Sequence, residues 1–171
     1  MADRTRESSR RPRIGTQTGR SRAQSVRLAA AFALGRSVES ARAPSGADMR
    51  SPASVRALLA AELRGLAQET FHVLLLDGKH RLRRRERISA GTLTSSLVHP
   101  REVFGPALRE GAAALIVAHN HPSGDPEPSS EDLAVTRRLI EAGRLIGVPL
   151  LDHVVIGAED YVSLRTRIPF P

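Results

Sequence analysis

The segment from Ala112 to Gly147 constrains the fold more than any other part of the chain. An apolar run of strand length, "AAALIVAHNH", leads into a short proline-rich loop, and "SSEDLAVTRRLIEAGRLIG" then has the spacing of an amphipathic helix. Because an apolar strand needs cover on both faces, this pattern predicts a sheet with helices packed on it. The helical residues predicted to face the core are Leu133, Leu139, Ile140 and Ile146.

Strands and helices also alternate in the rest of residues 51–171. "SPASVRALLAAELRGLAQET" predicts a helix with Ser51 as its N-cap and Pro52 at its first position. "FHVLLLDGKHRLRRRERISAGT" predicts a hairpin that turns at Asp77 and Gly78. We therefore predict an α/β domain with a mixed β-sheet and packed helices. The further predicted elements are a helix over 99–111 and strands over 148–157 and 161–165.

The positive charge of the chain is concentrated in residues 1–50, which hold 11 arginines against four acidic residues. We predict that this part is an Arg-rich arm with one short helix, over about 25–35, and a linker. A flexible, solvated arm is the interpretation that the composition favours, and non-specific contact with nucleic-acid phosphates is the alternative. The arginine-rich run over 81–87 is predicted to lie mostly on the solvent face of its strand.

Several classes of protein are disfavoured by what the sequence lacks. It contains no cysteine, so a metal ion would have to be held by nitrogen and oxygen atoms. No apolar run approaches the roughly 18 residues that a membrane span needs, and the first residues lack the apolar segment of a signal peptide. We therefore expect no contact with a membrane and a cytoplasmic location.

Two histidines end the apolar strand, and a carboxylate opens the helix that follows. His119 and His121 are two residues apart, so in a strand both side chains point to the same face. Ser129 or Ser130 caps the helix and places Asp132 in its first turn. Two imidazoles and one carboxylate leave the fourth position of a tetrahedral zinc ion open, as catalytic sites require. The alternative is that the histidines are loop residues and the aspartate only complements the helix dipole.

The segment "HNHPSGDPEPSSED" has the spacing His-x-His-x7-Ser-x2-Asp, which resembles the signature of JAMM (MPN-type) zinc metallopeptidases. "SLVHPREVF", "AHNHPSGDP" and "LLDHVVIG" further make residues 51–165 resemble the bacterial RadC family. The resemblance implies a cytidine-deaminase-like layout of the sheet and Zn²⁺ as cofactor. It assigns the zinc ligands to His119, His121 and Asp132.

The resemblance also implies two catalytic residues. It makes Ser129 the residue that helps to hold the polarised carbonyl or oxyanion, although this serine could equally be only a helix cap. It expects a glutamate before the first strand as general acid and base, and the candidate is Glu69 in "QETF". An exposed residue at a helix end is the alternative for Glu69. For His153, a satisfied core histidine is the favoured interpretation, and a role in orienting a ligand is the other.

Two functions follow as hypotheses. The first is a zinc-dependent hydrolase that cleaves an amide, peptide or isopeptide bond in a peptide or protein substrate. The second is a DNA-associated accessory protein of the RadC family, in repair or recombination, without relevant peptidase activity. RadC proteins normally carry a helical N-terminal region with a helix-hairpin-helix, and only "RLAAAFALGRS" resembles its end. This departure weakens the inference of DNA binding from the family.

Overall fold

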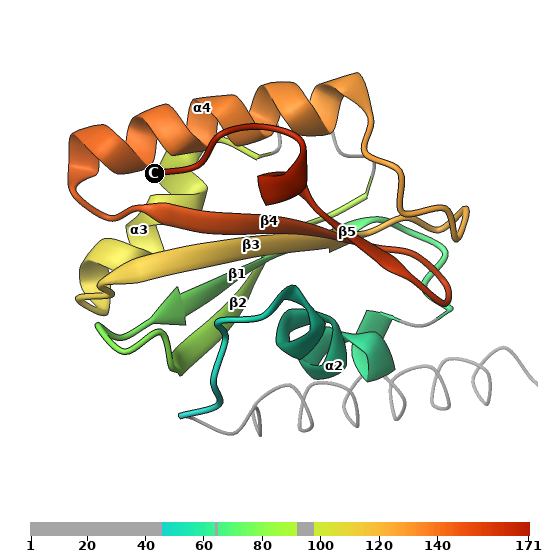
Figure 1. Ribbon diagram of the computed structural model, residues 1–171, viewed down its shortest axis with the longest axis horizontal. Coiled ribbons are helices and arrows are strands. Elements are labelled where there is room, and N and C mark those ends of the chain that lie inside the picture. Colours follow the sequence, from blue (N-terminus) through green and yellow to red (C-terminus); the bar gives the residue numbers. More distant parts are fainter. Residues whose placement is uncertain (1–45, 64, 92–97) are drawn as a thin grey trace, which may run out of the picture. The chain divides into compact units, whose positions relative to one another are not determined.

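The computed structural model describes residues 46–63, 65–91 and 98–171 (Figure 1). The predictions for the arm and its short helix fall on residues 1–45, which lie outside this range. The segment between the predicted hairpin and the next helix, residues 92–97, also lies outside it. The domain boundary at residues 50 and 51 stays a prediction.

The described strands form one mixed sheet, which confirms the predicted α/β class. β1 (Thr70–Leu76) pairs antiparallel with β2 (Leu82–Ala90) on one side and with β3 (Ala114–Asn120) on the other. β3 pairs parallel with β4 (Leu150–Ile156), and β4 pairs antiparallel with β5 (Tyr161–Ser163). The order across the sheet is β2-β1-β3-β4-β5. β1 and β2 form the predicted hairpin, and the one parallel pair is joined by a helical crossover, as a parallel connection requires.

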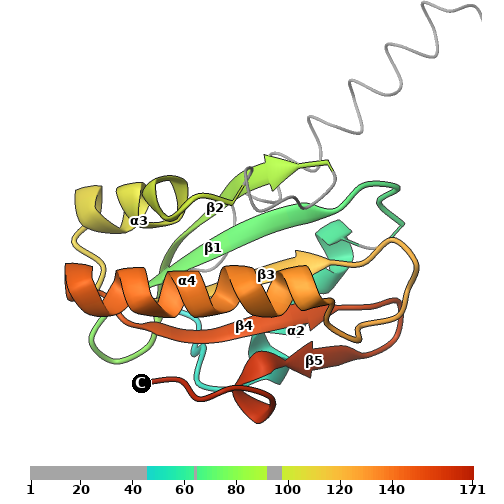
Figure 2. The same cartoon turned by 90° about the horizontal axis from the view of Figure 1, so that it is seen from above.

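Helices cover both faces of the sheet. α2 (Pro52–Leu63) packs on one face, whereas α3 (Pro100–Arg109) and α4 (Ser130–Ile146) pack on the other (Figure 2). A short 3-10 helix, η1 (Leu164–Thr166), follows β5. Because both faces are covered, β1 and β3 are buried along their whole length, as their apolar sequences predict. None of the helices in the described part of the chain is long and apolar enough to cross a bilayer.

The start of α2 confirms the predicted cap and shows how the preceding residues attach. The Ser51 hydroxyl accepts a hydrogen bond from the Ala53 backbone N–H at 3.1 Å. Just before it, Met49 is buried in the core under α2, and Asp48 forms a β-bridge with Arg81. The last residues of the predicted linker therefore pack against the domain.

Ile146 does not lie where its sequence pattern predicts, and Arg85 is an exception within a run that was predicted to be mostly solvated. Ile146 is 38% exposed, because it lies at the end of α4, and Gly143 is the last buried residue of that helix. Arg85 belongs to the predicted solvated run, yet its side chain is only 4% exposed and forms an ion pair with Glu62 of α2. The register explains the second case: Arg85 lies opposite Leu74, and cross-strand partners share a face, which here is the face that α2 covers.

Candidate metal centre

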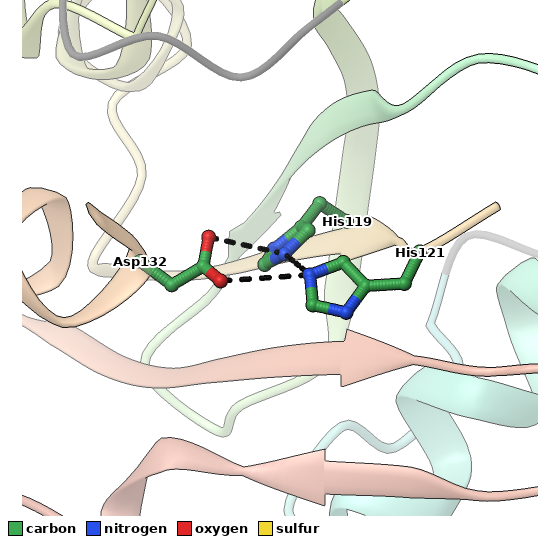
Figure 3. Close-up of side chains that lie close together, drawn as sticks. All are labelled: His119, His121 and Asp132. Carbon is green, nitrogen blue, oxygen red and sulfur yellow. Dashed lines mark hydrogen bonds and ion pairs between the residues drawn. The ribbon is translucent and has the colours of Figure 1, made fainter. Parts of the chain in front are cut away.

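The end of β3 positions both predicted histidine ligands. His119 lies in the strand and is fully buried, and the strand ends one residue later at Asn120. The backbone N–H of His121 still donates to the Ile156 carbonyl at 2.9 Å, which extends the parallel pairing past the last strand residue. The two imidazoles therefore point to the same side, toward Asp132 (Figure 3).

Asp132 is held by the cap of α4. Ser129, not Ser130, is the N-cap, and the two residues form a reciprocal capping box. The Ser129 backbone N–H and hydroxyl both donate to Asp132 Oδ2, at 2.8 and 2.7 Å. The helix start thus fixes the carboxylate with Oδ1 3.2 Å from His119 Nε2 and Oδ2 3.5 Å from His121 Nε2.

The distances within this triad fit a single metal ion. The two histidine Nε2 atoms are 3.0 Å apart, and they lie 3.2 and 3.5 Å from Oδ1 and Oδ2 of the carboxylate. A tetrahedral ion with ligands at 2.0–2.2 Å separates its ligand atoms by about 3.3–3.6 Å. His119, His121 and Asp132 are the one cluster of this kind among the described residues.

The proton on His121 is placed by a backbone carbonyl. His121 Nδ1 lies 2.7 Å from the Asp125 carbonyl oxygen. A carbonyl oxygen only accepts, so Nδ1 must carry the hydrogen, and in the neutral ring Nε2 then presents a lone pair. That lone pair points into the triad, where a metal ligand needs it.

The proton on His119 is placed by a longer chain of hydrogen bonds from α4. The Thr136 hydroxyl donates to the Asp132 backbone carbonyl, so its oxygen can only accept from His153 Nδ1, at 2.6 Å. His153 Nε2 is then the acceptor for His119 Nδ1–H, at 2.8 Å. In the neutral ring, His119 Nε2 then presents a lone pair as well. His153 is both a satisfied core histidine and the partner that orients a candidate ligand.

The pKa shifts of His153 and Asp132 also bear on whether the triad fits a metal ion. Burial lowers the pKa of His153 well below its usual value, and the neighbouring His119 lowers it further, so that ring is neutral. Burial raises the pKa of Asp132, but hydrogen bonds from His119 and His121 outweigh it and hold the pKa well below its usual range. In these hydrogen bonds the Nε2 atoms donate to the carboxylate, and the contacts of the triad are all within 3.5 Å. A metal ion that replaces these protons would take both imidazole nitrogens and the carboxylate as ligands, so the donor set fits a metal ion.

Glu69 lies directly before β1, where the sequence places it, and Asn120 holds this junction. Asn120 Oδ1 accepts from the Thr70 backbone N–H at 2.9 Å and from its hydroxyl at 2.8 Å. Its amide nitrogen donates to the Gln68 carbonyl at 3.1 Å. The pKa of His121 is raised, first by its hydrogen bond to Asp132 and to a smaller extent by the negative charge of Glu69. Glu69 is therefore near enough to the triad to act electrostatically on it.

Sequence reasoning missed this second network. Asn120 points to the face opposite His119, and the Thr70 hydroxyl that it binds also contacts His72 Nε2 at 3.1 Å. Because that hydroxyl donates to Asn120, it accepts from His72, whose Nδ1 is the one buried side-chain polar atom without a partner in the described part of the chain. The available signal was a polar residue at an inward position between the two histidines.

The layers of this fold and the His-x-His end of β3, opposite a capped aspartate, define a domain of the JAB (MPN) class. The comparison of the whole sequence with known families gives a more specific result. The RadC-like JAB domain family matches residues 49–168, and the chain belongs to that family.

Curated bacterial proteins are similar over most of the chain. It is 47% identical over 144 residues to the UPF0758 protein of Desulforamulus reducens and 50% identical over 141 residues to that of Trichlorobacter lovleyi. It is 50% identical over 145 residues to the UPF0758 protein of Syntrophotalea carbinolica. These matches cover 84%, 82% and 85% of this chain but 63%, 61% and 64% of the relatives. The chain therefore spans less than two thirds of the length of the relatives that it matches.

Proposed function

We propose that this protein is a zinc-dependent hydrolase that cleaves an amide, peptide or isopeptide bond of a peptide or protein substrate. The observation that carries the proposal is the convergence of two imidazole nitrogens and a carboxylate, from His119, His121 and Asp132, at distances close to those of a tetrahedral ion. Two imidazoles with one carboxylate are ligands that suit zinc better than magnesium or calcium. Three protein ligands also leave one position for a substrate or water, as in catalytic zinc sites.

In the proposed reaction each residue has one task. A bound zinc ion supplies a Lewis acid that polarises the substrate carbonyl and lowers the pKa of a water molecule. Glu69 accepts the proton of the attacking water and passes it to the leaving amine, so a single carboxylate serves as base and then as acid. Asn120 supports this task, because it fixes the backbone on both sides of Glu69.

The arrangement of Ser129 separates its two proposed tasks. In this structure its hydroxyl hydrogen is donated to Asp132 Oδ2, so its first task is to orient a metal ligand. Its second proposed task is to donate to the oxyanion of the substrate. The second task requires the hydroxyl to rotate away from Asp132, whose Oδ2 keeps the Ser129 backbone N–H as a donor.

The test combines metal analysis with a peptide-cleavage screen. Purified protein is expected to contain about one zinc ion per chain, because the triad is a single site. Glu69→Gln should keep the metal and lower turnover by about 10²–10⁴-fold, which is the usual contribution of a general base. Glu131→Gln is the matched control, since Glu131 is an exposed acid next to Asp132 and outside the triad. A wild-type protein that binds no metal, or full turnover by Glu69→Gln, would contradict the proposal.

The second candidate function is a DNA-associated accessory role without peptidase activity. The observation in its favour is the excess of arginine in residues 1–50. If that segment binds nucleic acid, replacing its arginines by glutamine in the full chain should abolish DNA binding that weakens with salt. DNA binding that survives the replacement would assign the contact to the folded domain.

A further inference from the structure

A pocket of about 250 Å³ lies beside the metal centre, between α2 and the loop that carries His121. In Figure 3, α2 (pale cyan) lies on the side of His121 that faces away from Asp132. The His121 ring lines this pocket and also belongs to the triad, so a group in the pocket is one side chain away from the candidate metal position. The two sites are therefore continuous.

The wall of the pocket opposite α2 is held by backbone contacts. The Gly124 N–H donates to the His121 carbonyl at 3.0 Å, and the Ala158 N–H donates to the Gly124 carbonyl at 2.9 Å. The two loops can approach this closely because residue 157 is glycine: a Cβ there would lie 2.4 Å from the Gly124 carbonyl oxygen. A wall fixed in this way needs no rearrangement to accept a ligand, which lowers the free-energy cost of binding.

The lining indicates what kind of group the pocket accepts. Four apolar side chains line it, Ala60, Leu63, Leu66 and Ile156, beside the polar side chains of Asn120, His121 and Ser123. Arg56 also lines it, and its guanidinium donates to the Glu159 carbonyl at 2.6 Å, which holds that charged group in place. The volume is smaller than the roughly 300–1,000 Å³ of sites for drug-sized ligands, so it suits one amino-acid side chain.

We propose that this pocket binds one apolar side chain of the substrate, next to the bond that is cleaved. The assignment of that side chain to a substrate rests on the proposed hydrolase function, whereas the binding of an apolar group rests on the pocket alone. Successive residues of an extended peptide advance by about 3.3 Å. A side chain held against His121 therefore places the neighbouring backbone carbonyl within about one residue of the triad.

The first test measures binding without catalysis. The full-length ¹⁵N-labelled protein is titrated with N-acetyl-leucinamide or N-acetyl-glycinamide, and the amide signals of Gly124, Gly157 and Ala158 are followed by NMR. We expect saturable shifts with the leucine compound and none with the glycine compound. Ala60→Leu fills the pocket and should weaken binding at least tenfold. Ala61→Leu is the matched control, because Ala61 is exposed on the same helix and does not line the pocket.

A second variant removes the dependence on one substitution. Leu66→Ala removes an apolar side chain from the lining and, unlike Ala60→Leu, puts no larger side chain into the pocket. It should also weaken binding of the leucine compound. Absence of saturable shifts in the wild type, or equal affinities for wild type, Ala60→Leu and Leu66→Ala, would overturn the proposal. If the wild type cleaves peptides, Ala60→Leu should lower kcat/KM for leucine-containing sites more than for glycine-containing sites. Binding without any cleavage would instead refute the hydrolase function and leave the pocket as a binding site.

Discussion

Removing the hydroxyl of Thr136 tests the hydrogen-bond chain that runs from Thr136 through His153 to His119. This hydroxyl fixes His153 with its proton on Nδ1, and His153 in turn fixes the proton of His119 on Nδ1. Thr136→Val keeps the shape of the side chain and removes the hydroxyl. The chain can then reverse, so that His153 Nε2 donates to His119 Nδ1. The one proton of the neutral His119 ring then lies on Nε2, where it blocks a metal ion.

The expected loss of zinc affinity in Thr136→Val follows from the burial of His153. In the variant, metal binding must restore the original proton positions, and this leaves the His153 Nδ1–H without an acceptor in a fully buried site. A buried donor without a partner costs about 1–3 kcal/mol. We therefore expect zinc affinity to fall by about 5- to 150-fold, which overlaps the 10- to 100-fold typical of changes to the partners of metal ligands.

The assay is competition for zinc with a chromophoric chelator, combined with ¹⁵N NMR of the imidazole nitrogens to assign the proton positions. Thr136→Ser keeps the hydroxyl and serves as the control, so its affinity should stay within about threefold of the wild type. The reasoning is refuted if Thr136→Val binds zinc as tightly as the wild type, or if its His119 remains protonated on Nδ1 in the metal-free protein.

Three further predictions concern the stability of the domain. Asn120→Ala leaves buried donors at the start of β1 without an acceptor, so the free energy of unfolding in urea should fall by about 1–3 kcal/mol while zinc stoichiometry is unchanged; loss of zinc would contradict the separation of the two networks. Burial and the nearby arginines lower the pKa of His72 from 6.5 to about 3, so the unfolded state binds more protons between these values and stability falls as the pH falls. Between pH 7 and pH 5 the wild type should lose about 2 kcal/mol more than His72→Gln, and equal losses would contradict the buried neutral ring. Gly143→Ala should lower the melting temperature, because its Cβ would lie 2.7 Å from the Val148 carbonyl oxygen, whereas Gly105→Ala meets only the end of a flexible side chain at 3.4 Å and should raise it; the same sign for both would contradict this packing.

The sequence predicted what depends on local spacing. The apolar periods predicted the helices and strands, and the spacing of His119, His121 and Asp132 predicted a cluster that the structure confirms as a possible metal site. The choice between Ser129 and Ser130 as the cap stayed open, because both are adjacent residues of a suitable type. It took the geometry of the loop to select Ser129.

The sequence could not predict what depends on register between distant segments. Thr136 and His153 are 17 residues apart, and they come into contact only because α4 packs on β4 in one particular position along the strand. The hydrogen bond from the Thr70 backbone N–H to Asn120 Oδ1 joins residues 50 positions apart. The sequence also left open which arginines of the run over 81–87 lie on the covered face, since only its pairing with β1 places Arg85 there. Local pattern gives the period of a strand, whereas register decides which partners its side chains find.

The two networks together give a physical reason for the middle residue of the His-x-His pattern. Successive side chains of a strand point to opposite faces. His119 therefore enters the network of α4 that sets the protons of the triad, and Asn120 enters the network that fixes the backbone around Glu69. Since the two residues are adjacent in one buried strand, the distance between the metal ligands and the proposed base is set by covalent geometry and two short hydrogen-bond chains. A shift of β3 by one residue relative to β1 would exchange the faces and disrupt both networks at once, so the strand register is itself a requirement of the site.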